Sequence, residues 1–304
     1  MKDKPKIIAA VGPTATGKSD LAIKIAKMLS TRGGPGAGII SADSRQVYRG
    51  MDIGTGKVTK KEQRMAKHYL IDIANPKKQF TVSDFKRLGG KAVKEILAKD
   101  KIPVVVGGTG FYIDALLKNI NLPEVPPDKK LRAQLDRLTA EKLFEKLKKL
   151  DPNRAKNIDG KNKRRLIRAL EIVMTTGRFV PPIISKNSNY EILWLGVNFP
   201  KEILNKRIKI RLEKRLKQGM IKEVKRLLEN DVSYKKLFDL GLEYRWVSQY
   251  LQGKISYKDM RDGLLKDIIK YSKRQMTWFK RNKEIVWIKN PKQALRLVDR
   301  FLLT

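Results

Sequence analysis

Residues 11–27 read VGPTATGKSDLAIKIAK and contain the pattern G-x-x-x-x-G-K-[ST] at Gly12, Gly17, Lys18 and Ser19. An apolar run at 7–11 precedes the pattern and an amphipathic helix, predicted over 18–30, follows it, which is the context of a phosphate-binding loop. In such a loop, backbone N–H groups and the helix N-terminus face an anion. We predict that Lys18 bridges phosphate oxygens and that the Ser19 hydroxyl binds Mg²⁺. The residues predicted to hold a diphosphate or nucleotide are Gly12, Pro13, Thr14, Ala15, Thr16, Gly17, Lys18 and Ser19.

Apolar strands and helices alternate on both sides of this loop. Strands are predicted over 7–11, 38–42, 69–73 and 103–106, and helices over 18–30, 83–99 and 110–118. Near-continuous apolar strands alternating with helices are typical of a parallel sheet buried between helical layers. The predicted class is therefore α/β, with a P-loop NTPase-like parallel sheet flanked by helices.

A change of composition interrupts the alternation. The proline-rich stretch NLPEVPPDKK (121–130) precedes helices dense in Lys and Arg over 131–176, and a second break, RFVPPIISKNSN (178–189), precedes an apolar strand at 192–197. We expect that strand to return to the sheet. This predicts an all-helical insertion domain at 120–190 and a catalytic core at 1–119 and 191–304. Further helices are predicted over 201–229 and 257–282, with a last strand at 285–288.

The types of side chain exclude several chemistries. The 304 residues contain no Cys, which excludes disulfides, thiolate metal sites and cysteine nucleophiles, and the single His68 argues against a histidine-built metal site or triad. No apolar run approaches the ~18 residues of a membrane span, and no signal peptide is evident. We expect a cytoplasmic monomer without membrane contact.

Charge is the largest compositional feature. The chain has 68 Lys and Arg against 31 Asp and Glu, a formal net charge of +37. Some of this excess serves solubility, but so much self-repulsion opposes the compact state unless a polyanion relieves it. The charge therefore favours a nucleic-acid partner.

A second polar stretch follows the predicted strand at 38–42. It reads IISADSRQVYRGMDIGTGK (39–57) and places Asp43 at the carboxyl end of that strand, where parallel strands open onto the same crevice as the phosphate loop. A carboxylate there could bind Mg²⁺ through water or accept a proton from a nucleophile. The alternative is that Asp43 only caps a helix or forms a turn.

Six stretches, taken together, make the chain resemble the bacterial tRNA dimethylallyltransferases, the IPP transferase family. The resemblance covers nearly the whole chain, and no single motif after the phosphate loop would suffice for it. The stretches are GPTATGKS (12–19), SADSRQVYRGMDIGTGK (41–57), HYLIDI (68–73), VVGGTGFYIDALL (105–117), RRLIRALEIVMTTG (164–177) and YSKRQMTWF (271–279).

The resemblance implies a reaction and its residues. A dimethylallyl group would pass from dimethylallyl diphosphate to N6 of the adenosine 3′ to the anticodon, in the tRNA anticodon stem-loop. Asp43 matches the family's general base, Thr109 a threonine beside the reacting centre, and Arg211 an arginine at the leaving diphosphate. Ser19 and Asp43 would lie near the metal. The residues implied to contact tRNA are Asp43, Ser44, Arg45, Gln46, Thr109, Arg132, Arg164, Arg165 and Arg168.

Three other functions remain open at the level of sequence. An adenylate isopentenyltransferase would perform the same chemistry on free AMP, ADP or ATP, but it needs no large basic insertion. A P-loop kinase or ATPase would leave the later motifs unexplained. A noncatalytic RNA-binding protein with an anion site would have no use for Asp43 beside phosphates.

Overall fold

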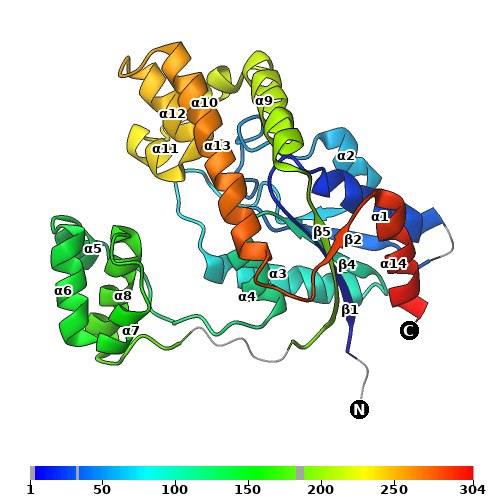
Figure 1. The fold of residues 1–304 in the computed structure, drawn as a ribbon, viewed down its shortest axis with the longest axis horizontal. Coiled ribbons are helices and arrows are strands. Elements are labelled where there is room, and N and C mark those ends of the chain that lie inside the picture. Colours follow the sequence, from blue (N-terminus) through cyan, green and yellow to red (C-terminus); the bar gives the residue numbers. More distant parts are fainter. Residues whose placement is uncertain (1–3, 32–33, 183–187, 304) are drawn as a thin grey trace. The chain divides into compact units, whose positions relative to one another are not determined.

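The computed structural model describes residues 4–31, 34–182 and 188–303 and divides the chain into two compact units. One unit comprises Met1–Asn119 and Asn187–Thr304, and the other comprises Ile120–Lys186. Each is described by itself below (Figure 1). Of the predicted second break at 178–189, residues 183–187 lie outside the described part of the chain.

A six-stranded parallel sheet forms the centre of the first unit. The strands are β1 (Lys6–Val11), β2 (Ala37–Ser41), β3 (His68–Tyr69), β4 (Ile102–Gly107), β5 (Glu191–Val197) and β6 (Val286–Ile288), in the order β3-β2-β4-β1-β5-β6. β1 pairs with β4 on one side and with β5 on the other. Five of its six residues are buried, because helices cover both faces of the sheet. The predicted parallel α/β sheet is confirmed.

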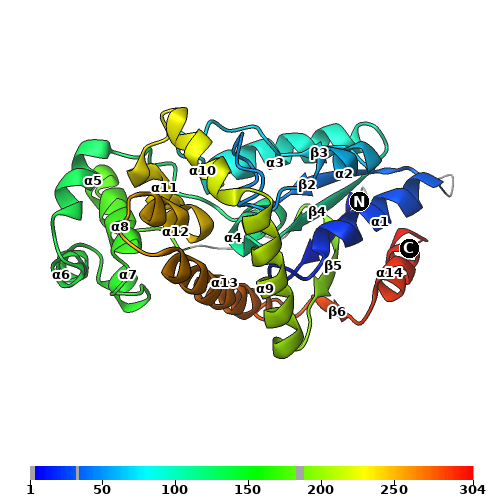
Figure 2. The same ribbon diagram turned by 90° about the horizontal axis from the view of Figure 1, so that it is seen from above.

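Two groups of helices cover the sheet. α1 (Lys18–Thr31) and α14 (Pro291–Leu303) pack on one face, around Ile25, Leu29 and Val298. α3 (Val82–Leu97), α4 (Gly110–Leu117) and the end of α13 (Tyr257–Phe279) pack on the other, around Phe85 and Phe279. Figure 2 shows α1 and α3 on opposite sides of the strands. The arrangement brings α13, remote in sequence, to the carboxyl ends of the strands.

A helical layer with its own core completes the first unit. It contains α9 (Lys201–Lys217), α10 (Met220–Glu229), α11 (Tyr234–Leu240), α12 (Leu242–Leu251) and the first half of α13. Its buried residues, among them Leu212, Val224 and Tyr244, pack against Val47 and Met51 of the segment that follows β2. The polar stretch identified in the sequence therefore lies between the sheet and this layer.

Several predicted boundaries were wrong. The strand expected over 69–73 ends at Tyr69, because Leu70 and Asp72 adopt positive φ values of 62° and 57° that no strand accommodates. The helix expected over 201–229 is two helices, broken at Gly219, whose φ of 98° ends the first. Four further helices were not predicted: α2 (Lys60–Met65), α11, α12 and α14.

The second unit is a bundle of α5 (Lys129–Asp136), α6 (Ala140–Leu150), α7 (Pro152–Lys156) and α8 (Lys163–Thr176). Leu135, Leu143, Leu147, Leu166 and Leu170 form its core. Each helix begins after a residue whose side chain accepts a hydrogen bond from a first-turn N–H, and these residues are Asp128, Thr139, Asp151 and Asn162. The expected helical insertion is present.

Candidate active site

The phosphate loop connects β1 to α1 and curls tightly. Gly12 has a φ of 143°, and a Cβ there would lie 2.2 Å from the Val197 carbonyl oxygen of β5, so only glycine fits. The Thr16 hydroxyl donates to the Pro13 carbonyl at 2.8 Å, and Ala15 has a positive φ of 63°. These features give the loop the shape that turns backbone N–H groups toward an anion.

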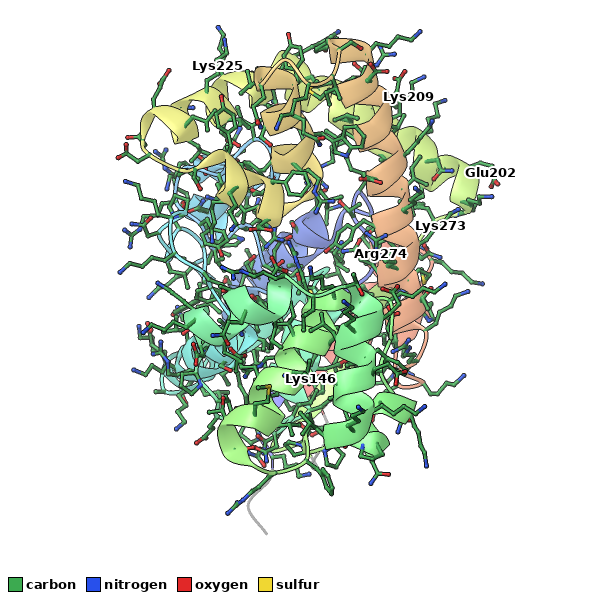
Figure 3. All side chains as sticks on the ribbon, turned by 90° about the vertical axis from the view of Figure 1, so that its left-hand side faces the viewer. Lys146, Glu202, Lys209, Lys225, Lys273 and Arg274 are labelled. Carbon is green, nitrogen blue, oxygen red and sulfur yellow. The ribbon has the colours of Figure 1, made fainter. Side chains whose placement is uncertain are left out.

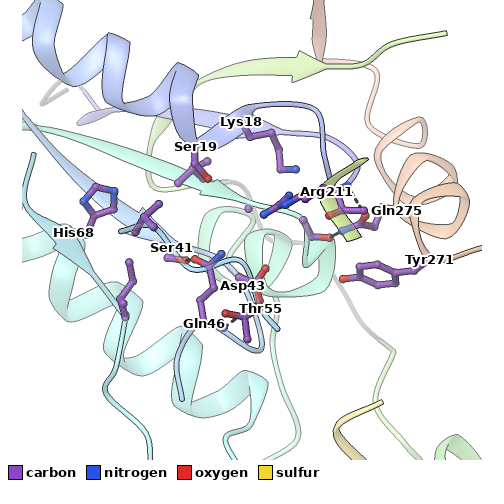
Figure 4. Close-up of a pocket in the computed structure, with 16 residues that line it drawn as sticks. Lys18, Ser19, Ser41, Asp43, Gln46, Thr55, His68, Arg211, Tyr271 and Gln275 are labelled. Atoms are coloured by element: carbon purple, nitrogen blue, oxygen red, sulfur yellow. Dashed lines mark hydrogen bonds between the residues drawn. The ribbon is translucent and has the colours of Figure 1, made fainter. Parts of the chain in front are cut away.

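The loop forms one wall of a pocket at the carboxyl ends of the strands (Figure 4). Lys18 and Ser19 enter the pocket from the loop, Asp43 from the end of β2, Arg211 from α9 and Tyr271 from α13. Six of the residues predicted from sequence thus line one pocket although they lie on separate segments: Thr14, Lys18, Ser19, Asp43, Gln46 and Arg211.

Two cations face this pocket without an acidic partner. Among the described residues, neither Lys18 nor Arg211 forms a salt bridge; Lys18 Nζ donates to the Pro13 carbonyl at 2.5 Å and Arg211 Nη2 to the Gly56 carbonyl at 3.3 Å. Burial and the nearby Arg211 charge lower the pKa of Lys18 to about 7, although Asp43 opposes the shift. Burial and the Arg215 charge lower the pKa of Arg211 to about 10. A bound anion would relieve both effects.

Asp43 has one engaged and one open oxygen. Its Oδ1 accepts the backbone N–H groups of Arg45 at 2.8 Å and Gln46 at 3.3 Å, whereas no described residue donates to Oδ2. The backbone N–H of Ser44 donates to Thr109 Oγ1 at 3.1 Å, so Thr109 is tied to the segment that carries Asp43. The carboxylate is therefore held in a fixed orientation and can still accept a proton.

Tyr271 lies beside Asp43 and was not singled out by the sequence analysis. Burial and the Asp43 charge raise the pKa of Tyr271 to about 12, so the phenol stays neutral at physiological pH. Its ring lines the pocket (Figure 4) and offers an apolar face with one polar end.

Comparisons with known proteins identify the family of this chain. A family model described as IPP transferase matches residues 46–282. The chain belongs to the IPP transferase family. The tRNA dimethylallyltransferase of Finegoldia magna is 40% identical over 294 residues, covering 94% of this chain and 91% of the relative. That of Thermomicrobium roseum is 38% identical over 292 residues, covering 94% and 87%.

Solved structures of IPP transferases resemble this fold as well. The tRNA isopentenylpyrophosphate transferase of Bacillus halodurans is 33% identical, with a TM-score of 0.72 over 99% of this chain and 96% of that one. A eukaryotic dimethylallyltransferase acting on tRNA is 25% identical, with a TM-score of 0.75 over 90% of this chain and 70% of that one. The family predicted from six sequence stretches is confirmed.

A turn at residues 52–56 forms another wall of the pocket in this IPP transferase. The buried Glu223 carboxylate accepts the backbone N–H groups of Asp52 at 2.8 Å, Ile53 at 2.6 Å and Gly54 at 3.0 Å, and Tyr244 Oη at 2.9 Å. The sequence analysis missed Glu223, because an acidic residue in a Lys-rich helix has the sequence pattern of an exposed residue.

Arginines of α9 support the same wall and the phosphate loop. Arg215 pairs with Glu243 at 3.0 Å and donates to the Gly54 carbonyl at 3.2 Å. Arg207 Nε donates to the Ala15 carbonyl of the phosphate loop at 2.8 Å. The predicted Arg211 lies between them in sequence. Because the three arginines are spaced four residues apart, they lie on one face of α9, and that face covers the donor site.

The predicted tRNA-binding residues of the first unit differ in accessibility. Gln46 is 9% exposed; its Oε1 accepts from the Ser41 hydroxyl at 3.1 Å and its Nε2 donates to the Gly56 carbonyl at 3.3 Å. Arg45 is half-buried and donates to the Ser44 carbonyl at 3.2 Å. The side chains of Lys209, Lys225 and Lys273 extend outward from α9, α10 and α13 (Figure 3).

The four predicted arginines of the bundle fall into two pairs. Arg132 and Arg168 hold Glu171, which is fully buried: Arg132 donates to both carboxylate oxygens at 2.7 Å, and Arg168 Nη1 to Oε2 at 2.5 Å. Burial raises the pKa of Glu171, but these arginines outweigh it and leave the pKa lowered. Arg164 and Arg165 lie on the exposed face of α8. The second pair is thus the more accessible to phosphate.

The oxygen donors in the pocket suit a magnesium ion. Mg²⁺ binds a few protein oxygens and completes its shell with water and substrate phosphates. The Ser19 hydroxyl and the Asp43 carboxylate supply two such oxygens (Figure 4). Over residues 4–31, 34–182 and 188–303, no group of three or more His, Cys, Asp or Glu side chains could hold a metal alone, so the diphosphate would have to share in binding it.

Proposed function

We propose that this chain transfers a dimethylallyl group from dimethylallyl diphosphate to N6 of the adenosine that follows the anticodon of a tRNA, with Asp43 as the general base. The activity of a tRNA dimethylallyltransferase follows from its family. The observation that carries the assignment of residues is the pocket itself, in which two partly buried cations that form no salt bridge with a described residue lie near a carboxylate with one open oxygen.

The donor half of the pocket stabilises the leaving group. As the C1–O bond of the donor breaks, positive charge develops on the allylic carbon and negative charge on the diphosphate. Lys18, Arg211 and the N–H groups of residues 15–19 are already in place to bind that charge, so they need not reorganise during the reaction. Mg²⁺, held through Ser19 and Asp43, would supply further charge neutralisation.

The acceptor half handles the adenine. The exocyclic amine is a weak nucleophile because its lone pair is delocalised into the ring, and it must lose a proton as the C1–N6 bond forms. Asp43 Oδ2 would accept that proton and release it to solvent after diphosphate leaves. The adenosine would leave its stack in the anticodon loop to reach the pocket, where Tyr271 offers a face for stacking and Thr109 a hydroxyl.

The basic helical insertion at 120–190 distinguishes this reaction from the same chemistry on a free nucleotide. A free AMP needs no second unit, whereas an anticodon stem-loop presents many phosphates, to which basic residues of the bundle would bind. The bundle residues we propose for this role are Arg132, Arg164, Arg165 and Arg168. In the first unit, Ser44, Arg45 and Gln46 would contact the target nucleotide.

Cellular context completes the proposal. No helix within the described residues is both long and apolar enough to cross a membrane. Because the proposed substrate is a tRNA and the chain has no cysteine, we place the protein in the cytoplasm, acting as a monomer.

Mass spectrometry of reaction products tests the function. The protein is incubated with dimethylallyl diphosphate and, separately, with unmodified tRNA, AMP or ATP. Digestion of the tRNA should yield an adenosine carrying one added five-carbon group, with AMP and ATP unchanged. Prenylated AMP with unmodified tRNA would indicate an adenylate isopentenyltransferase, and phosphate release from ATP without prenyl transfer would indicate a kinase or ATPase.

A further inference from the structure

Gln275 of α13 connects two loops of the active site that are far apart in sequence. Its side chain is 6% exposed. Its Oε1 accepts the backbone N–H of Thr14 in the phosphate loop at 2.8 Å, and its Nε2 donates to the Gly108 carbonyl at 2.9 Å. One amide group therefore joins the end of β1 to the end of β4.

The orientation of this amide is fixed by its partners. A main-chain N–H can only donate and a carbonyl can only accept, so a rotated amide would break both bonds. The site is also closely packed: a Cβ on Gly108 would lie 2.1 Å from Gln275 Nε2. Because the bond to Gly108 is buried and the bond from Thr14 is partly buried, loss of either partner would leave a poorly satisfied polar group next to the donor pocket.

The contacts continue from Gly108 to the general base. The next residue, Thr109, accepts the N–H of Ser44, and Ser44 adjoins Asp43. On the other side, the N–H of Thr14 is satisfied by Gln275, which leaves the later N–H groups of the loop to face the diphosphate. The amide thus sits between the loop that binds the leaving group and the segment that carries the base.

We propose that Gln275 is a positioning residue that sets the placement of the phosphate loop relative to the Thr109 and Asp43 segment. This role rests on the proposed function for the identity of the donor. It predicts that Gln275, through its two main-chain hydrogen bonds, governs binding of the diphosphate and its alignment with the base.

Two nearly isosteric variants separate the roles of the two hydrogen bonds. Q275M fills the same space without either bond. Q275E keeps the acceptor, loses the donor to Gly108 and adds a negative charge beside the diphosphate site. Thr277→Ala, on the exposed side of the same helix, is the control because its hydroxyl bonds only to Lys273.

Binding of inorganic diphosphate with Mg²⁺, measured by calorimetry, gives the first readout. At pH 8, Q275M should bind at least tenfold more weakly than the wild type and Q275E more weakly still, while tRNA affinity stays within twofold. Thr277→Ala should match the wild type. Wild-type affinity in Q275M would overturn the role of Gln275, whereas a wild-type protein that does not bind diphosphate would contradict the proposed function.

The pH dependence of Q275E gives a readout that a purely structural role would not move. A protonated carboxyl group has one acceptor oxygen and one O–H donor, so it can reproduce both bonds of the amide. The ratio of the Kd of Q275E to that of the wild type, in which the titration of diphosphate itself cancels, should therefore fall severalfold between pH 8 and pH 5.5. A ratio that stays constant with pH would overturn the proposal.

Discussion

At the scale of single residues, the site is defined by two cations, Lys18 and Arg211, that form no salt bridge within the described part of the chain. Lys18 and Arg211 are partly buried, and desolvation together with a neighbouring cation, Arg211 for Lys18 and Arg215 for Arg211, lowers the pKa of each. A bound diphosphate would offset both effects, so the affinity for diphosphate and the protonation of Lys18 should be coupled.

Lys18 should therefore take up a proton when the donor binds. Its pKa of about 7 in the free protein lies far below the ordinary value of 10.5, and a bound diphosphate would raise it again. Diphosphate binding should weaken as pH rises above 7, because deprotonated Lys18 must regain its proton. Calorimetry at pH 8 in two buffers of different ionisation enthalpy measures the uptake. Lys18→Arg, whose guanidinium stays charged, should abolish it, and equal uptake in the variant would assign the proton elsewhere.

Asp43 should contribute to chemistry and little to binding. An Asp43→Asn substitution keeps the Oδ1 contacts to the N–H groups of Arg45 and Gln46 but removes the proton acceptor. We expect kcat to fall by about 10²–10⁴, the usual worth of a general base, with tRNA Kd unchanged. Single-turnover rates and filter binding measure the two quantities separately. Equal losses in both would show that Asp43 mainly binds tRNA.

At the scale of elements, the sequence predicted what depends on local pattern and missed what depends on packing. The phosphate loop can be predicted from the sequence because its strand, glycines and helix are contiguous. Asp43 can be predicted because it follows the end of a strand. The helices α10 and α13 bring three residues to the site from remote parts of the sequence: Glu223, Tyr271 and Gln275. The hydrogen bond between Thr14 and Gln275 joins residues that are 261 positions apart. The family resemblance predicted Thr109 and Arg211 as site residues. Their contacts, with the N–H of Ser44 and the carbonyl of Gly56, become visible only in the three-dimensional structure.

The turn at 52–56 allows a test of how α9 positions its arginines. Gly56 has a φ of 57°, and a Cβ there would lie 2.0 Å from Arg215 Nη2 and 2.3 Å from Arg211 Nη2. Gly56→Ala should displace Arg211 and raise KM for the donor about tenfold. Gly253→Ala is the matched control, because Gly253 has a similar φ of 70° with nothing within 4 Å of a Cβ.

Both glycine variants should lose stability by about 1–2 kcal/mol from backbone strain alone. Thermal unfolding measures this shared loss, and steady-state kinetics measures the difference in KM. If the two variants showed the same KM, the contact with Arg211 and Arg215 would have no bearing on donor binding.

At the scale of the whole molecule, the net charge of +37 has to serve both solubility and RNA binding. The bundle separates these uses. Arg132 and Arg168 neutralise a buried carboxylate, and their loss would leave Glu171 with no cation and only the N–H of Asp128 as a donor, whereas Arg164 and Arg165 lie on an exposed face. Removal of Arg132 or Arg168 should therefore destabilise the bundle in addition to any effect on phosphate binding.

Charge-removing variants of the two pairs make this separation measurable. The double variant Arg164→Gln, Arg165→Gln should reduce the slope of log K for tRNA against log salt by roughly 1–2, since each lost phosphate contact removes about 0.7–0.9 from it. Arg132→Gln should instead destabilise the bundle by about 1–3 kcal/mol, because it withdraws two hydrogen bonds from the fully buried Glu171. Its effect on the salt slope, measured at a temperature where the bundle remains folded, shows whether that guanidinium also reaches phosphate. An unchanged slope in the double variant would place the RNA-binding face of the bundle away from the start of α8.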